Sequence, residues 1–182
     1  MNTKLLCRMF LAILGFCNIG CSNQNGIQHG LKHGITSSEL ADYDSAVARF
    51  SEAIRRKSDD VGAYSNRGVV HVKQGRLDNA IGDFSEVIRL RPDLAGAYSN
   101  RGIAYIRKNR LDKAIADFNE AIRIKPDLAG AYSNRGIAYG KKGELDKAYA
   151  DFKRAHQLDP SIPAHPGYYA SQESSSNNDK GR

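Results

Sequence analysis

The chain has 182 residues, a length that suits about one domain with short tails. Its formal net charge is +7, which favours anionic partners weakly and does not determine the fold. All 3 cysteines lie within the first 21 residues, at Cys7, Cys17 and Cys21. The rest of the chain therefore has neither a disulfide framework nor a cysteine-based metal site.

The first 21 residues have the order of a secretory signal peptide. Lys4 and Arg8 supply positive charge, residues 9–16 form a short apolar run, and small residues then lead to Cys21. This run is shorter than the roughly 20 residues that a transmembrane helix needs. We therefore expect residues 1–21 to direct export.

Residues 18–21, Asn-Ile-Gly-Cys, also resemble a bacterial lipobox, which implies that Cys21 is lipidated and anchors the chain to a membrane. Ser22 follows with no Asp nearby, and by resemblance to lipoprotein sorting this implies the outer membrane. Asn18 stands where the motif usually has Leu. The alternative is therefore an exported chain without a lipid, soluble in the periplasm or secreted.

Residues 22–30 are polar and contain glycine, and we expect them to form a tether. Residues 31–60 are an imperfect copy of the unit that follows them. We expect two helices there, at 31–40 and 43–56. Terminal copies of a repeat are often atypical because they cap the stack.

The next part of the chain repeats with a period of 34 residues. The segment AYSNRG occurs 3 times, starting at Ala63, Ala97 and Ala131. The units run over residues 61–94, 95–128 and 129–162. A fixed period of this length predicts a solenoid of stacked helical pairs.

Each unit carries the signals of two helices. Residues 111–125 place their apolar side chains three and four apart, which predicts an amphipathic helix. We expect Asp112, like Asp78 and Asp146 in the other units, to cap the start of this helix. The first helix of each pair is expected to end near a residue that accepts a left-handed conformation. These residues are Gly75, Asn109 and Gly143.

After the last unit, residues 163–182 contain Pro163 and Pro166 and become rich in Ser, Asn and charge. They offer little to bury, and we expect a disordered tail.

The aligned positions strongly resemble the tetratricopeptide repeat family, whose pattern has a bulky residue, Gly, an aromatic, two Ala, an aromatic and Pro at fixed offsets. His71 at the second aromatic position and Val87 at the later Ala are the departures. The resemblance implies an all-α fold, a right-handed superhelical solenoid of antiparallel helix pairs. The positions that carry it are Tyr64, Tyr98 and Tyr132; Gly68, Gly102 and Gly136; Ala80, Ala114 and Ala148; Phe84, Phe118 and Phe152; and Pro92, Pro126 and Pro160.

In this family the first helices line a concave groove that binds a protein or an extended peptide. The matching positions here repeat as Ser, Asn, an aliphatic residue and a basic residue. Asn amides suit a peptide backbone, and the basic row suits an acidic ligand. The groove residues implied are Ser65, Asn66, Val69, Lys73, Ser99, Asn100, Ile103, Arg107, Ser133, Asn134, Ile137 and Lys141. The resemblance also implies that Ile106 lies in this groove.

One variant of the family clamps the C-terminal carboxylate of chaperones with Lys, Arg and Asn. The shared Asn position is matched at Asn66, Asn100 and Asn134. Gly130 and Asn134 stand at Lys and Arg positions of the clamp, so we do not expect that specificity.

Two further expectations concern the stack itself. An Arg follows each groove Asn, at Arg67, Arg101 and Arg135, and we expect it to pair with the recurrent Asp83, Asp117 and Asp151. At the last repeat, Tyr149 and His156 replace isoleucines, which makes the end of the stack more polar. A further hypothesis is homodimerisation, either by end-to-end stacking or by exchange of the tails that contain Tyr168 and Tyr169.

The sequence gives no sign of catalytic chemistry, a cofactor or a metal. His29 and His33 have helical spacing, but the segment is glycine-rich and two solvated histidines are the simpler interpretation. Basic residues are interleaved with acidic ones and accompany no base-reading motif, which argues against nucleic acid. The resemblance to the tetratricopeptide repeat family, together with the export signal, implies a non-catalytic protein-binding scaffold at the bacterial cell envelope. The alternative is a targeting or regulatory subunit of an envelope enzyme complex, such as one that turns over peptidoglycan.

Overall fold

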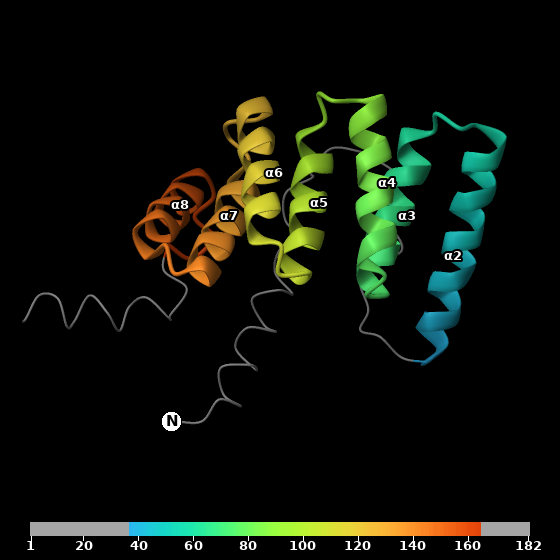
Figure 1. Cartoon of the computed structure of the whole chain (residues 1–182), viewed down its shortest axis with the longest axis horizontal. Helices are drawn as coiled ribbons and strands as arrows, with labels where there is room; N and C mark the ends of the chain where they lie inside the picture. Colours follow the sequence, from blue (N-terminus) through green and yellow to red (C-terminus); the bar gives the residue numbers. More distant parts are fainter. Residues whose placement is uncertain (1–36, 165–182) are drawn as a thin grey trace, which may run out of the picture.

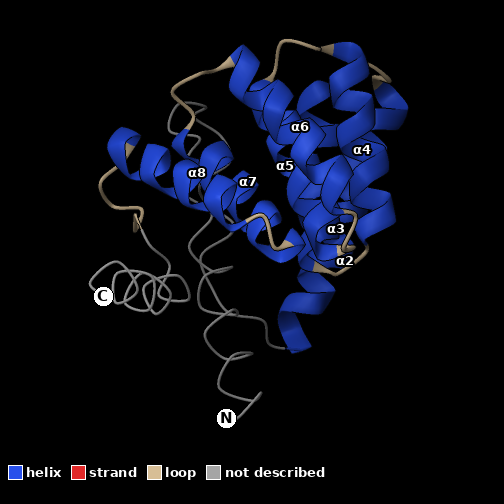
Figure 2. Ribbon diagram, turned by 60° about the vertical axis from the view of Figure 1, so that its left-hand side comes forward, coloured by secondary structure: helices blue, strands red, loops and turns tan. Residues whose placement is uncertain are grey.

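The computed structural model describes residues 37–164 (Figure 1). Within this range the chain forms α-helices joined by short loops and no strand (Figure 2). The helices are α2 (Ser37–Arg56), α3 (Val61–Lys73), α4 (Leu77–Leu90), α5 (Ala95–Arg107), α6 (Leu111–Ile124), α7 (Ala129–Lys142) and α8 (Leu145–Leu158). The predicted all-α class is confirmed.

Consecutive helices pack against each other along the whole stack, from α2 on α3 to α7 on α8. Figure 1 shows them following one another in sequence order along the long axis. Beyond these neighbours, α3 contacts α5 and α5 contacts α7, whereas no contact joins α4 to α6 or α6 to α8. The helices α3, α5 and α7 therefore form the inner, concave row, and α4, α6 and α8 form the outer row of a solenoid.

Each pair is held by a small residue facing a large one. Gly102 of α5 lies so close to Phe118 of α6 that a Cβ atom on it would be 2.8 Å from two ring carbons. Phe118 and Ala114 are both 0% exposed. The same arrangement recurs between Gly68 and Phe84. Burial of this ring stabilises each pair, and glycine permits the close approach.

The first helix of each pair closes as the sequence predicts. Gly75, Asn109 and Gly143 have φ angles of 73°, 57° and 81°. The amide of the following residue donates to a carbonyl five residues back, as in Arg110 N to Tyr105 O at 2.9 Å. This is the Schellman arrangement, which satisfies the last carbonyls of the helix.

The predicted caps at Asp78, Asp112 and Asp146 are wrong. The N-cap residues of α4, α6 and α8 are Arg76, Arg110 and Glu144, and none makes a side-chain capping bond. Asp78 and Asp112 lie one residue inside their helices and bind lysines of the next repeat instead, Lys108 and Lys142. A short acidic residue near a helix start does not cap it unless it occupies the boundary position itself.

The break predicted between a helix at 31–40 and a helix at 43–56 is also wrong. α2 is one continuous helix of 20 residues from Ser37, so residues 37–40 belong to it. One period before Gly75 the chain has Ala41, which lacks the left-handed preference that closes the other first helices. Alanine is the best helix former, and the helix continues through this point.

Residues 1–36 and 165–182 lie outside the described residues. The predicted signal peptide, Cys21, the tether, the first part of the degenerate unit, His29, His33 and most of the predicted tail fall there. Among the helices that the structure does describe, none combines the length and the apolar character that crossing a membrane would require.

Candidate functional site

The inner row of α3, α5 and α7 carries the groove positions predicted from the sequence. Most are half-buried, as expected for side chains on the inside of a curved stack. Arg107 and Lys141 are exposed at the ends of α5 and α7. The half-buried set is Ser65, Asn66, Val69, Lys73, Ser99, Asn100, Ile103, Ser133 and Ile137.

Two groove residues differ from the expectation. Asn134 is only 5% exposed, so its amide is enclosed, whereas Asn66 and Asn100 at the equivalent positions are half-buried. Ile106 is 7% exposed and belongs to the hydrophobic core of the stack. The inner surface therefore presents two accessible amides, followed by a third repeat with a more closed face.

The basic row is not uniform. Arg107 Nη1 donates to the carbonyl oxygen of Val72 at 2.9 Å, so this guanidinium joins the end of α5 to the end of α3. Burial lowers the pKa of Lys73. Lys73 is half-buried, whereas Lys141 is exposed. Positive charge on the inner face is therefore greatest toward Arg107 and Lys141.

The predicted Arg–Asp pairing is confirmed in every repeat. Arg101 Nε and Nη2 donate to the two carboxylate oxygens of Asp117 at 2.9 and 2.8 Å. Its Nη1 donates to Ser85 Oγ of the preceding repeat, also at 2.9 Å. One guanidinium thus joins three helices, α4, α5 and α6, and we call this arrangement the arginine staple.

The other staples follow the same rule with the same spacing. Arg67 joins Asp83 and Ser51, and Arg135 joins Asp151 and Asn119. The carboxylate is the largest cause that raises the pKa of each arginine. Each arginine directly follows a groove Asn, so the staple fixes the backbone from which the candidate binding side chains project.

Aromatic rings add to the staple. The Arg101 guanidinium lies 5.9 Å from the ring centre of Tyr98 and 6.0 Å from that of Tyr105. Arg135 lies in the same way over Tyr132 and Tyr139. These cation–π contacts restrict the arginine further and favour a rigid inner row.

A set of exposed ion pairs between repeats was not predicted. Lys142 Nζ lies 2.6 Å from Asp112 Oδ1, and Lys108 pairs with Asp78 in the repeat before. The sequence signal is a recurrent Lys 30 residues after a recurrent Asp, which only becomes meaningful once the stacking distance is known. Exposed pairs of this kind contribute little to stability, because water solvates both charges when they separate.

His71 replaces the tyrosine found at Tyr105 and Tyr139 and is only 5% exposed. Its Nε2 lies 3.9 Å from Asp83 Oδ2, and its Nδ1 has no hydrogen-bond partner within the described chain. Burial lowers the pKa of His71, opposed in part by the Asp83 carboxylate. Within residues 37–164, no group of three or more His, Cys, Asp or Glu residues is placed to hold a metal ion.

Comparison with protein families agrees with the repeat geometry. Models of the tetratricopeptide repeat match residues 31–95 and 129–162, and a TPR repeat model matches residues 104–143. Together these matches cover more than half of the chain. The chain therefore belongs to the tetratricopeptide repeat family. Curated protein sequences gave no match.

Solved structures show the same fold. MamA from Desulfovibrio magneticus RS-1 superposes with a TM-score of 0.62 at 24% identity, covering 68% of this chain and 70% of that one. The Arabidopsis OM64 TPR domain gives 0.58 at 24% identity, covering 62% and 92%. The first TPR of Spaghetti (RPAP3), bound to the HSP90 peptide SRMEEVD, gives 0.60 at 25% identity, covering 67% and 96%.

Proposed function

We propose that this protein is a non-catalytic scaffold that holds an extended segment of a partner protein against the inner row of α3, α5 and α7. The observation that carries the proposal is the repetition of one face on three adjacent helices. Ser, Asn and an aliphatic residue recur there every 34 residues, on backbones fixed by the arginine staples. A row of this kind suits a ligand that is itself repetitive, such as a peptide backbone.

The chemistry of the inner row selects the kind of segment. Asn66 and Asn100 each offer an amide that both donates and accepts, which matches the groups of an extended peptide. Val69 and Ile103 can receive apolar side chains between them. Arg107 and Lys141 place positive charge at one end of the row, which favours a segment with acidic residues.

The peptide-bound Spaghetti (RPAP3) repeat supports binding of a peptide by this fold. The ligand class here differs, because Gly130 and the enclosed Asn134 stand at Lys and Arg positions of the carboxylate clamp. We propose recognition along the peptide backbone, without a clamp for its C-terminus. A role as the targeting subunit of an envelope enzyme complex would use the same face.

We also propose that the chain works at the bacterial cell envelope, exported by residues 1–21 and anchored by a lipid on Cys21. Support comes from the charged, apolar and small-residue order of this segment and from its resemblance to a lipobox. Cys21→Ser should move the chain from the membrane fraction to the soluble envelope fraction. Retention of this variant in membranes would reject the anchor, and mass spectrometry of the mature N-terminus would identify the modified residue.

Binding by the inner row is tested with Asn66→Ala combined with Asn100→Ala. Crosslinked pull-down from envelope fractions should recover at least about tenfold less partner than the native chain recovers, because two backbone-binding amides are lost. The matched control is Asn79→Ala, the same change on exposed α4 of the outer row. Equal recovery by all three chains, with helicity unchanged by circular dichroism, would reject the inner row as the binding face.

A further inference from the structure

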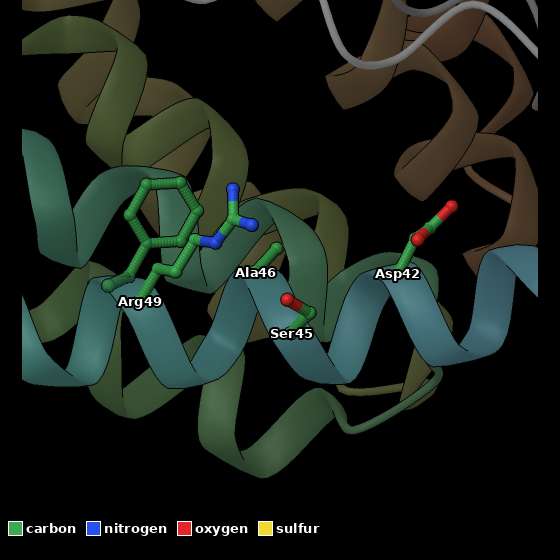
Figure 3. A pocket seen from close by; sticks show the side chains of 5 residues that line it. Asp42, Ser45, Ala46 and Arg49 are labelled. Carbon is green, nitrogen blue, oxygen red and sulfur yellow. The ribbon is translucent and has the colours of Figure 1, made fainter.

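The helix α2 exposes a face that the other outer helices bury. Ala46 and Phe50 occupy the positions of Ala80 and Phe84, which are 0% and 1% exposed. On α2 both residues are half-buried, because no first helix of a pair lies over them in the described chain. They line a hollow of about 420 Å³ together with Asp42, Ser45 and Arg49, and Figure 3 shows these three side chains along one side of α2 with Ala46 between them. We call this surface the α2 face.

The charge on the α2 face is reversed relative to the other repeats. Arg49 stands one period before Asp83, the carboxylate that receives Arg67 of the covering helix α3. A covering helix of the same kind would bring its arginine against Arg49 and be repelled. An occupant that brings a carboxylate to Arg49 is therefore favoured over one that brings a second positive charge.

The segment of the chain before α2 cannot supply this group. Residues 1–36 contain neither Asp nor Glu. Arg49 is exposed and forms no ion pair within the described part of the chain, and the same holds for Asp42. Within the described residues, the α2 face thus carries two charges of opposite sign that have no ion-pair partner, beside apolar side chains.

The charges of Asp42 and Arg49 are complementary to those of a second, antiparallel α2 helix. Asp42 and Arg49 are seven residues apart, which places them two turns and about 10.5 Å from each other on one side of the helix. Ser45 and Ala46 lie midway between them and are small enough to let two helices approach closely. If a second α2 runs antiparallel about a two-fold axis near Ser45 and Ala46, each Asp42 meets the other Arg49.

We propose that a second copy of this chain docks on the α2 face and forms a symmetric dimer through an antiparallel pair of α2 helices. The contact closes the α2 face around Ala46, covers Phe50 further and gives both Arg49 side chains a carboxylate. One helix from each chain makes a small interface, so we expect association in the micromolar range. The dimer leaves the inner rows free and doubles the number of binding faces held at one point.

The test is an exchange of charges, read by the mass of the full chain in sedimentation equilibrium across the micromolar range. The native chain should reach twice its monomer mass, which is 20.0 kDa when residues 1–21 are retained. Asp42→Arg alone and Arg49→Asp alone should each raise the dissociation constant at least about tenfold, because like charges then face each other across the axis. The two changes together restore opposite charges and should return the dissociation constant close to the native one.

The matched control is Asp127→Arg, the same charge change at an exposed loop residue outside α2, which should leave the dimer intact. All changed residues are exposed, so circular dichroism should show native helicity in each variant. A native chain that keeps its monomer mass throughout would overturn the proposal and point to a different occupant of the α2 face. A dimer that survives both single reversals, or a double variant that stays monomeric, would overturn it as well.

Discussion

The glycines that face phenylalanine rings are the most sensitive single residues of the stack. A Cβ atom at Gly102 would lie 2.8 Å from Cε1 and Cζ of Phe118, and this ring is fully enclosed. Gly82 is also inside a helix, but nothing lies within 4 Å of a Cβ built on it. The same substitution at the two glycines should therefore have opposite effects.

Gly102→Ala should lower the free energy of unfolding by about 1–3 kcal/mol, because the pair α5–α6 must separate to admit the methyl group. Gly82→Ala should raise it by about 0.5–1 kcal/mol, since alanine is the better helix former. Ala116 and Ala150 already occupy this position in the next two repeats. Urea titrations of both variants measure the difference, and equal stabilities would contradict the close helix contact.

His71 should make the stability of the fold depend on pH near neutrality. Its pKa is lowered by burial, so in the unfolded chain it binds a proton at a higher pH than in the folded chain. The contribution is fully present above the unfolded pKa of about 6.5 and is lost as the pH falls from there through the lower folded pKa. His71→Tyr restores the residue of the other repeats and should reduce the loss of melting temperature over this window. An identical loss in both chains would show that His71 does not titrate against folding.

At the scale of the helices, we expect the arginine staple to stabilise the contact between repeats, whereas the exposed ion pairs add little. Asp117 has an 8% exposed side chain and holds Arg101, whereas the side chain of Asp112 is 86% exposed and holds Lys142. Losing a carboxylate in the first case leaves a partly enclosed guanidinium without its partner. In the second case, water replaces the partner.

Asp117→Asn should therefore cost about 3 kcal/mol of unfolding free energy. Asp112→Asn should change it by less than about 1 kcal/mol. Chemical denaturation followed by circular dichroism measures both on the same helix, α6. Comparable costs would mean that the staple is no more than a surface ion pair.

Helix existence and pairing could be predicted from the sequence because they follow local rules. Three signals determine them, and each operates within one helix or between neighbouring helices. They are the period of 34 residues, the Arg–Asp spacing and the left-handed residues Gly75, Asn109 and Gly143. The sequence did not predict that α2 is one continuous helix. The decisive residue is Ala41, which does not favour the left-handed conformation that ends the first helix in the other repeats. The enclosure of Asn134 depends on how three helices curve together, which residue spacing does not specify.

At the scale of the whole molecule, the two ends of the stack are not alike. Lys153 stands where Ser51, Ser85 and Asn119 accept the arginine of the following repeat. An arginine from a further repeat would be repelled there. His156 Nδ1 lies 2.7 Å from the carbonyl oxygen of Ile162, so the chain also turns back across this end. Continuation of the stack in register is disfavoured at α8, whereas no helix of the described chain covers the α2 face.

A stack of this kind should tolerate removal of one whole repeat. Deleting residues 95–128 joins Leu94 to Ala129 and places Arg135 beside Ser85 and Lys142 beside Asp78, as Arg101 and Lys108 are now. The shortened chain should remain helical and unfold in one transition at a lower temperature, because each repeat contacts only its neighbours. Thermal melts followed by circular dichroism measure this, and an unfolded shortened chain would contradict a nearest-neighbour architecture.

Site-directed photo-crosslinking can show whether the inner row holds the partner. A photoreactive residue is placed in turn at Ser65, Ser99 and Ser133 on the inner row, and at the outer-row positions Gly82, Ala116 and Ala150, which share the same period and are exposed. We expect one partner to be crosslinked from the inner positions and none from the outer ones. Crosslinks confined to the outer positions, or equal from both rows, would contradict it.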